Sequence, residues 1–258
     1  KLNIFVLDED PVKAAEYHCN KHVVKMILES AQMLSTVHWQ YLYDDIKKNN
    51  HPKIFKRQRD KFEYIKANTD LNLQPPYKMT HIHHPCTIWT SMSYGNYMWH
   101  VELAQALLCE YTKRYKKVHK SSSVIQWLAD HPPKGIPIKP RTHFAVAIKN
   151  PDFRVLDANS SISIGPKREG GPLTWDLVRD IGVKSGCITD EDLNPIDFDG
   201  KTNFRELKKM TDEKKLYYTY YDVVASYRKY YIKDKVRFAK WEPHTKIPKW
   251  FLEGLNER

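Results

Sequence analysis

Four side chains near the N-terminus have types and spacing suited to acid–base chemistry. His18, His22, Lys25 and Glu29 follow one another at intervals of four, three and four residues. On a helix that opens at Pro11, these intervals place all four side chains on one narrow stripe, because successive residues turn by about 100°. We therefore predict that the stripe forms one wall of an active site. A solvent-facing strip is the alternative.

The residue types on this stripe suggest a division of catalytic roles. His18 or His22 would transfer the proton, and Lys25 would stabilise negative charge on the substrate. Glu29 would orient an imidazole or stabilise developing positive charge. Asp8, at the end of a predicted strand and close to the helix N-terminus, is a second carboxylate for that role.

A metal site is an alternative use of the same residues. Two imidazoles four residues apart can hold one ion, with Asp8, Glu29 or His84 as a third ligand. The sequence lacks the glutamate of the H-E-x-x-H motif between these histidines, and Lys25 would repel a cation. We assign no metal ligands and predict no cofactor, and a divalent metal stays open as an alternative.

A second group of candidate residues surrounds a helix predicted from Pro85 to about Val118. One side of this helix carries polar groups between apolar ones, and buried polar groups must find hydrogen-bond partners or face a cavity. We predict that this helix and the stripe enclose a pocket that receives a base. An internal hydrogen-bond network is the alternative. The predicted substrate-binding residues are His83, His84, Trp89, Ser93, Asn96, Tyr97 and His100.

The charge of the chain favours a polyanionic partner. Lys and Arg number 42 against 31 Asp and Glu, which gives a formal net charge of +11. Nucleic acid, DNA in particular, is the predicted partner, and charge for solubility alone is the alternative. Two basic segments contain aromatic residues as well, the first near Lys113 to Lys120 and the second on a helix predicted from about Leu216 to Trp241. The predicted phosphate contacts are Lys113, Arg114, Lys117, Lys120, Lys229, Lys233, Arg237 and Lys240.

Hydrophobic patterning predicts a mainly helical fold. Short strands are predicted at Leu2 to Leu7 and Phe144 to Ile148, and a further helix at Leu173 to Ile181. A basic loop is predicted at Gly165 to Pro172. We expect one irregular helical domain over residues 1–258, with a short N-terminal strand, few other strands, and an insertion at about 151–215.

Several protein classes have no support in the sequence. No apolar run approaches the length of a membrane span, and the N-terminus lacks the features of a signal peptide. The four cysteines are far apart, which favours reduced thiols in a cytosol over a disulfide framework. The P-loop, the dinucleotide-binding glycine motif and the serine-hydrolase elbow are all missing from the sequence.

Several blocks of sequence resemble a family of proteins encoded by large tailed bacteriophages, including T-even-like and cyanobacterial phages. These blocks are 7–11, 18–26, 84–89, 96–97 and 114–120, and the resemblance returns near 226–241. The resemblance implies a location in the cytoplasm of an infected bacterial cell. Because such phages modify their DNA bases, it also implies a looser similarity to helical enzymes that act on hypermodified thymine.

Together these features predict a phage enzyme that acts on a nucleic-acid base or nucleotide. Its reaction would be DNA base modification by group transfer, or base excision as in a glycosylase, with the base extruded into the predicted pocket. One alternative is a non-catalytic DNA-binding or host-takeover protein. Another is a metal-dependent nuclease or phosphohydrolase built from Asp8, His18, His22 and His84.

Overall fold

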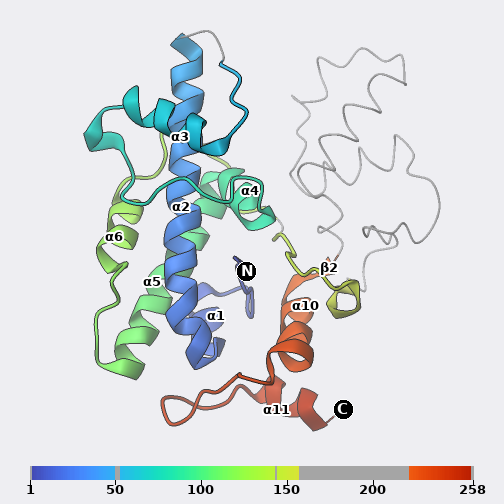
Figure 1. Cartoon of the computed structure of the whole chain (residues 1–258). Helices are drawn as coiled ribbons and strands as arrows, with labels where there is room; N and C mark the ends of the chain where they lie inside the picture. The colour runs from blue at the N-terminus through green and yellow to red at the C-terminus, as the bar shows by residue number, and fades with distance from the viewer. Residues whose placement is uncertain (1, 50–52, 143, 157–220, 257–258) are drawn as a thin grey trace, which may run out of the picture. The chain divides into compact units, whose positions relative to one another are not determined.

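The computed structural model describes residues 2–49, 53–142, 144–156 and 221–256, and these are mainly helical, as predicted (Figure 1). They belong to two compact units. The first unit comprises residues 1–141 and 239–247, and the second comprises residues 142–238 and 248–258. This division into units does not test the prediction of a single domain, which stays a prediction.

The first two helices correct the prediction of one continuous helix from Pro11 to about Gln40 or beyond. Helix α1 spans Pro11–Tyr17, and α2 spans Asn20–Asn49. The start of α1 is as predicted, because Asp10 accepts hydrogen bonds from two backbone N–H groups and Pro11 occupies the first turn. His18 then adopts an extended conformation, with ψ of 130°, and ends the helix.

Residues distant in sequence hold this break between α1 and α2. The indole of Trp241 donates a hydrogen bond to the carbonyl of Tyr17 at 3.0 Å, and the carbonyl of Lys240 accepts one from the backbone of Asn20 at 2.7 Å. These bonds satisfy backbone groups that a continuous helix would pair internally. The break is therefore a product of tertiary structure.

The helix predicted from Pro85 to about Val118 is also two helices, α4 (Pro85–Ser91) and α5 (Tyr94–Tyr115). Ser93 separates them and caps α5 by accepting a hydrogen bond from the backbone of Asn96 at 3.1 Å. Helix α5 ends at Tyr115 because Lys116 takes a left-handed conformation, with φ of 55°.

Helix α2 lies at the centre of the first unit (Figure 1). It contacts α3 (Gln58–Ala67), α4, α5 and α6 (Ser122–Asp130), and α5 also packs along α1. A short 3₁₀ turn, η1 (Leu71–Leu73), follows α3. The C-terminal half of α2 and helix α3 share a buried cluster of Trp39, Tyr43, Phe62, Ile65 and Met79.

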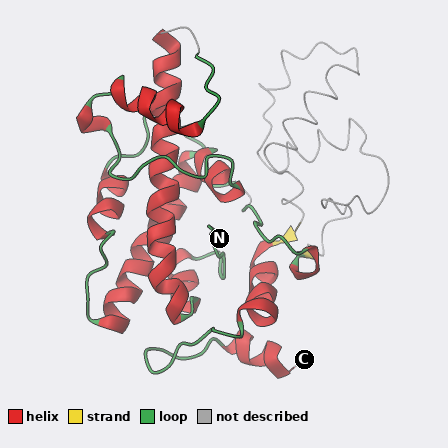
Figure 2. Ribbon diagram, viewed as in Figure 1, coloured by secondary structure: helices red, strands yellow, loops and turns green. Residues whose placement is uncertain are grey.

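The predicted strands at Leu2 to Leu7 and Phe144 to Ile148 are wrong. Residues 2–7 are buried, but they form no strand, and neither do residues 144–148. The backbone N–H of Asn3 donates to the side chain of Glu29 and not to a neighbouring strand. Within the described residues, the strands are β1 (Val155–Leu156) and β2 (Tyr221–Asp222), which pair antiparallel with Val155 opposite Asp222 (Figure 2).

The described part of the second unit contains a 3₁₀ turn η2 (Pro151–Phe153), β1, β2, α10 (Val223–Tyr230), a π-helical turn η4 (Tyr231–Lys235) and α11 (Lys249–Asn256). The predicted helix over Leu216 to Trp241 is therefore shorter at its C-terminal end, and residues 216–220 lie outside the described residues. The predicted helix at 173–181, the loop at 165–172 and most of the predicted insertion also lie outside them.

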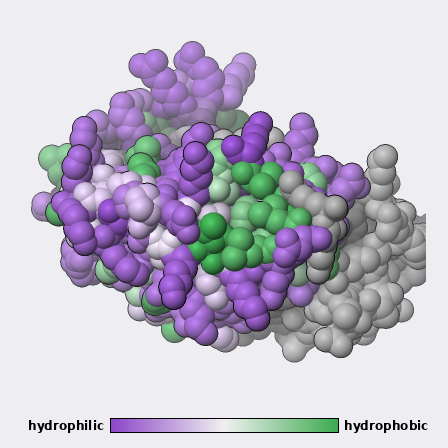
Figure 3. All heavy atoms as spheres, turned by 90° about the horizontal axis from the view of Figure 1, so that it is seen from below, coloured by the Kyte–Doolittle hydropathy of each residue, from purple (hydrophilic) through white to green (hydrophobic). Residues whose placement is uncertain are grey.

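The high content of charged residues in the chain predicts a hydrophilic surface. Hydrophilic side chains cover most of the face shown in Figure 3, with a group of hydrophobic side chains among them. Among the described helices, none is long and apolar enough to span a membrane.

Candidate functional site

The N-terminal segment links the predicted catalytic stripe on α2 to helix α4. The carboxylate of Glu29 accepts a hydrogen bond from the backbone N–H of Asn3 at 3.0 Å and pairs with the ammonium of Lys25 at 2.9 Å. The side-chain oxygen of Asn3 in turn accepts a hydrogen bond from the thiol of Cys86, on α4, at 3.5 Å. Glu29 is thus 7 % exposed and held from two sides.

The same chain of hydrogen bonds continues to His100 on α5. The hydroxyl of Thr90 donates to the carbonyl of Cys86 at 2.8 Å, so it accepts from Nδ1 of His100 at 2.9 Å. Burial lowers the pKa of His100 to about 3, which keeps the ring neutral. Its Nε2 is buried and has no hydrogen-bond partner among the described residues.

His18 and His22 meet around the ring of Phe5. The Phe5 ring stacks on His22 with centroids 4.4 Å apart, and it contacts His18 edge-on at 6.2 Å. Nδ1 of His18 donates to the carbonyl of Ala14 at 2.6 Å. Burial, assisted by the charge of Arg114, lowers the pKa of His18 to about 4 against the effect of that hydrogen bond. Nε2 of His18 has no partner among the described residues.

The geometry brings the rings of His18 and His22 to within 6.4 Å of each other and buries both of them, and it buries His100 as well. A neutral imidazole with a vacant Nε2 is a proton acceptor, but a general base must approach the reacting atom within about 2.6–3.2 Å. His18 and His100 have no exposed surface, and His22 is 4 % exposed. The prediction that His18 shares a helical stripe with His22 is wrong, because the break before α2 removes it from that helix.

Arg114 corrects the prediction of a phosphate contact at that position. Its guanidinium donates to the carboxylate of Glu110, the carbonyls of Glu16 and His18, and the side chain of Asn20, at 2.8 to 3.1 Å. These contacts use all of its N–H donors, and its side chain has 0 % exposure. Arg114 therefore fastens α5 to the break between α1 and α2.

The other residues of the first basic segment remain at the surface. Lys117 and Lys120 are exposed, and Lys113 is exposed although its ammonium pairs with Glu110 at 3.1 Å. Their placement leaves these three side chains accessible to an anion.

The residues of the second predicted basic segment, Lys229, Lys233, Arg237 and Lys240, do not form one ridge on a single helix. Lys229, Lys233 and Arg237 belong to the second unit, whereas Lys240 belongs to the first. Four-residue spacing aligns side chains only on an α-helix, and the π-helical turn after Tyr230 changes that register. The prediction of a single ridge is therefore wrong.

Most of the predicted substrate-binding residues on α4 and α5 pack the corner between these helices. The hydroxyl of Ser93 donates to the carbonyl of Pro140 at 3.0 Å, and the amide of Asn96 donates to the carbonyl of Trp89 at 2.7 Å. Tyr97, which is fully buried, donates to the carbonyl of Leu128 at 2.8 Å. These contacts match the alternative of an internal hydrogen-bond network.

The remaining predicted site residues lie in turns. Nδ1 of His84 accepts from the backbone of Cys86 at 3.2 Å and caps α4, while His83 is exposed. Asp8 accepts from the backbone of Asp10 at 3.1 Å and shapes the turn before α1. Among the described residues, no three His, Cys, Asp or Glu side chains are arranged to hold a metal ion.

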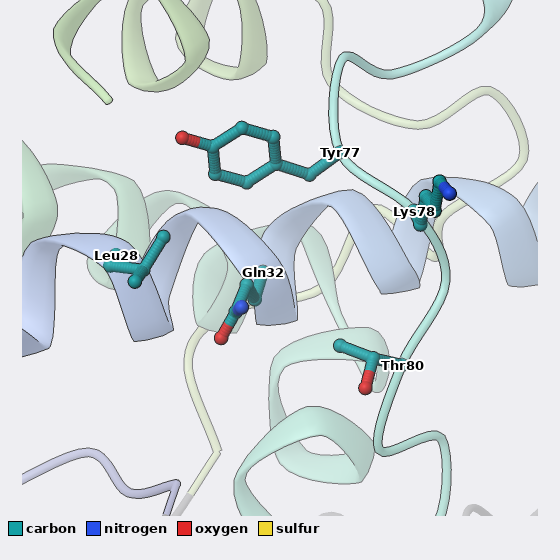
Figure 4. Close-up of a pocket in the computed structure, with 5 residues that line it drawn as sticks. All are labelled: Leu28, Gln32, Tyr77, Lys78 and Thr80. Atoms are coloured by element: carbon teal, nitrogen blue, oxygen red, sulfur yellow. The ribbon is translucent and has the colours of Figure 1, made fainter. Parts of the chain in front are cut away.

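An open pocket of about 310 Å³ lies further along α2. Its lining consists of Leu28 and Gln32 from α2 and Tyr77, Lys78 and Thr80 from the segment before α4. Figure 4 shows Leu28 and Gln32 projecting from the helix, with Tyr77 and Thr80 reaching toward it from one loop. The pocket therefore combines an aromatic ring, an aliphatic side chain, an amide and a cation.

The first basic segment runs beside this pocket. The hydroxyl of Tyr77 shares a hydrogen bond with that of Ser121 at 2.9 Å, and the ring of His119 bonds to the backbone of Val24 on α2. Lys117 and Lys120 thus belong to a segment that is anchored to the pocket wall and to the helix that forms its floor.

Sequence reasoning missed these pocket residues. The segment around Tyr77 follows two prolines and has no helical or strand periodicity, so the sequence predicts only a loop there. One signal that could have identified the pocket is the aromatic side chain of Tyr77 directly before the cationic side chain of Lys78. A second was the spacing of Gln32 seven residues after Lys25, which places both on one face of α2.

Comparison with protein-family models, curated proteins and solved structures gives no match to this chain. The resemblance to phage proteins therefore stays a prediction, and the function is argued from the site.

Proposed function

We propose that this chain binds nucleic acid, DNA in the first instance, and holds one unstacked base in the pocket of Leu28, Gln32, Tyr77, Lys78 and Thr80. The observation that carries the proposal is the hydrogen bond between Tyr77 and Ser121, which joins the pocket wall to the Lys117–Lys120 segment. The proposed base-binding pocket therefore lies next to the proposed phosphate-binding segment.

The side chains of the pocket have complementary roles in this proposal. The ring of Tyr77 and the side chain of Leu28 provide apolar faces for stacking a base. The amide of Gln32 carries both a donor and an acceptor, as does the edge of a nucleobase. Lys78, Lys117 and Lys120 are exposed and would meet the phosphates on either side of the base.

The experiment measures binding of a fluorescently labelled oligothymidylate by anisotropy. Stacking on an aromatic side chain contributes about 1–3 kcal/mol per base, so Tyr77→Leu should weaken binding by roughly 5- to 150-fold. Tyr77→Phe keeps the ring and removes only the hydroxyl that contacts Ser121, so it serves as the matched control and should bind within about 3-fold of wild type.

A Tyr77→Leu protein that binds as tightly as wild type would contradict the base pocket. If Tyr77→Phe weakens binding as strongly as Tyr77→Leu, the hydroxyl contact and not the ring is responsible, and the stacking role is wrong. Helical content by circular dichroism shows that each variant is folded.

An enzyme that acts on the bound base, of phage origin as the sequence resemblance implies, is a second candidate. Lys25 and Glu29 form an ion pair on the face of α2 that also carries Gln32, within two turns of the pocket. This pair would supply a carboxylate and a cation next to a bound base. Glu29→Gln preserves an acceptor for the backbone of Asn3 while removing the charge.

Mass spectrometry of nucleosides from modified phage DNA tests this candidate. Wild type should change the nucleoside composition, and Glu29→Gln should not, although both bind the oligonucleotide. If the nucleosides were unchanged after incubation with wild type, the proposed enzymatic activity would be contradicted. The proposal of a nucleic-acid-binding protein would be unaffected.

A further inference from the structure

A second pocket in the first unit differs in character from the base pocket. Its volume is about 250 Å³, and its lining is almost wholly polar. The side chains come from three helices and are Gln40, Tyr41 and Asp44 of α2, Lys61 of α3, and Ser91 at the end of α4. No part of the proposed function uses these residues.

Apart from the second N–H of the Gln40 amide, the neutral groups of this pocket are left as hydrogen-bond acceptors. The hydroxyl proton of Tyr41 is donated to the carbonyl of Ser91 at 2.7 Å, and that of Ser91 to the carbonyl of Ile88 at 2.7 Å. The amide nitrogen of Gln40 donates to the carbonyl of Ile82 at 3.4 Å, while its buried Oε1 has no partner among the described residues. A ligand must therefore bring donors of its own.

The two charged groups of the pocket have opposite signs and do not pair with each other. Asp44 pairs through one oxygen with Lys47 at 2.6 Å. The ammonium of Lys61 lies 4.2 Å from the centre of the Tyr43 ring and forms no ion pair with a described carboxylate. Burial lowers the pKa of Lys61, helped by the charge of Lys47 and opposed by Asp44. An anionic group beside Lys61 would offset that loss of hydration.

We propose that this pocket binds a small zwitterion, namely a free α-amino acid with a short side chain. Its ammonium carries three N–H donors and would face the oxygens of Gln40, Asp44 and Tyr41, while its carboxylate would face Lys61. The cavity of about 250 Å³ is below the range of about 300–1,000 Å³ found for drug-sized ligands, so the ligand must be compact.

Neither half of such a ligand fits the pocket alone. An isolated anion would satisfy Lys61 but would be repelled by the carboxylate of Asp44. An isolated ammonium would satisfy Gln40 and Asp44 but would meet the positive charge of Lys61. The arrangement therefore requires both charges on one small molecule.

The test is a titration of the isotope-labelled protein, followed by nuclear magnetic resonance, with glycine as the probe. Glycine should shift resonances of pocket residues in a saturable manner. Methylammonium and acetate, each carrying one of its charges, should bind at least tenfold more weakly. Trimethylglycine keeps both charges but has no N–H donor, so it should also bind at least tenfold more weakly.

Variants locate the binding. Asp44→Asn and Lys61→Met should each weaken glycine binding at least tenfold, whereas Lys66→Met, on the same helix α3 but outside the pocket lining, should leave it unchanged. Absence of saturable glycine shifts in the folded wild-type protein would overturn the proposal. It would also be overturned if trimethylglycine bound as well as glycine, or if Asp44→Asn and Lys61→Met bound glycine normally. Oligonucleotide binding measured in the same samples is independent of these outcomes.

Discussion

The imidazole cluster, meaning here the buried rings of His18, His38 and His100, and the open pocket on α2 differ in how residue chemistry relates to access. His18 and His100 are reactive residue types with vacant nitrogen atoms, yet both are fully buried. The pocket is open, and its walls include the unreactive side chains of Leu28 and Gln32. In this chain the residue types best suited to chemistry support the core, while less reactive residues line the open pocket.

This difference separates the expected effects of substitution. In the imidazole cluster, a change alters stability because it changes charge or hydrogen bonding in the interior. At the pocket, a change alters binding and leaves the fold intact. Stability and binding measured on the same variants therefore test whether the two regions are distinct.

The largest expected effect is loss of stability in mild acid. Burial lowers the pKa of His18 and His38 to about 4 and that of His100 to about 3. The unfolded chain takes up these protons below about pH 6.5, but the folded chain does not until the lower values are reached, so stability is lost as the pH falls. Between about pH 6.5 and its own lowered pKa, each ring accounts for a loss of about 3–5 kcal/mol in the free energy of unfolding. The three losses together are as large as the whole stability of a typical domain, about 5–15 kcal/mol.

Urea unfolding followed by tryptophan fluorescence at several pH values measures this loss. Between pH 6.5 and 5 the free energy of unfolding should fall by up to about 1.4 kcal/mol per pH unit for each of the three rings. The control is His38→Phe, which keeps a ring against Tyr97 and Trp127 and should remove the contribution of one proton from the slope. Constant stability over this range would mean that these rings are accessible to protons, and the contrast with the pocket would fail.

A smaller loss of stability is expected from Arg114→Met. Removing the guanidinium leaves Oε2 of the buried Glu110 carboxylate and the carbonyls of Glu16 and His18 without the donor that Arg114 supplies. Breaking a buried ion pair on one side costs about 3–5 kcal/mol, which should appear as a lower urea midpoint. The neighbouring Lys113→Met, at a side chain 59 % exposed, should change stability by less than about 1 kcal/mol. If the two substitutions lowered the urea midpoint equally, Arg114 would not be the residue that holds α5 against the break between α1 and α2.

Local signals in the sequence predicted the parts of the fold that depend on local chemistry. Asp10 with Pro11, and Pro85, mark the starts of α1 and α4 as expected. The spacing of Trp89, Asn96 and His100 correctly predicted that these side chains are buried.

Long-range contacts determine the features that the sequence could not predict. The end of α1 depends on a hydrogen bond between Arg114 and the carbonyl of His18, 96 residues apart in sequence. Whether residues 2–7 form a strand depends on the partner of the Asn3 backbone, which is a side chain on α2. The pocket wall at Tyr77 lies in an aperiodic segment, and the carbonyl of Tyr77 accepts a hydrogen bond at 2.8 Å from the indole of Trp39 on α2, 38 residues earlier in the sequence. Periodicity carries no information about such pairings.

The smallest expected effect distinguishes the lysines beside the pocket from one another. If Lys117 and Lys120 each contact a phosphate, Lys117→Gln and Lys120→Gln should each reduce the slope of log affinity against log salt concentration by about 0.7 for single-stranded DNA. Lys113→Gln should reduce it less, because the ammonium of Lys113 already pairs with Glu110. Anisotropy titrations at several salt concentrations measure these slopes. A reduction by Lys113→Gln as large as that by Lys117→Gln would place the strand along α5 instead, away from Tyr77, and would separate the phosphate contacts from the base pocket.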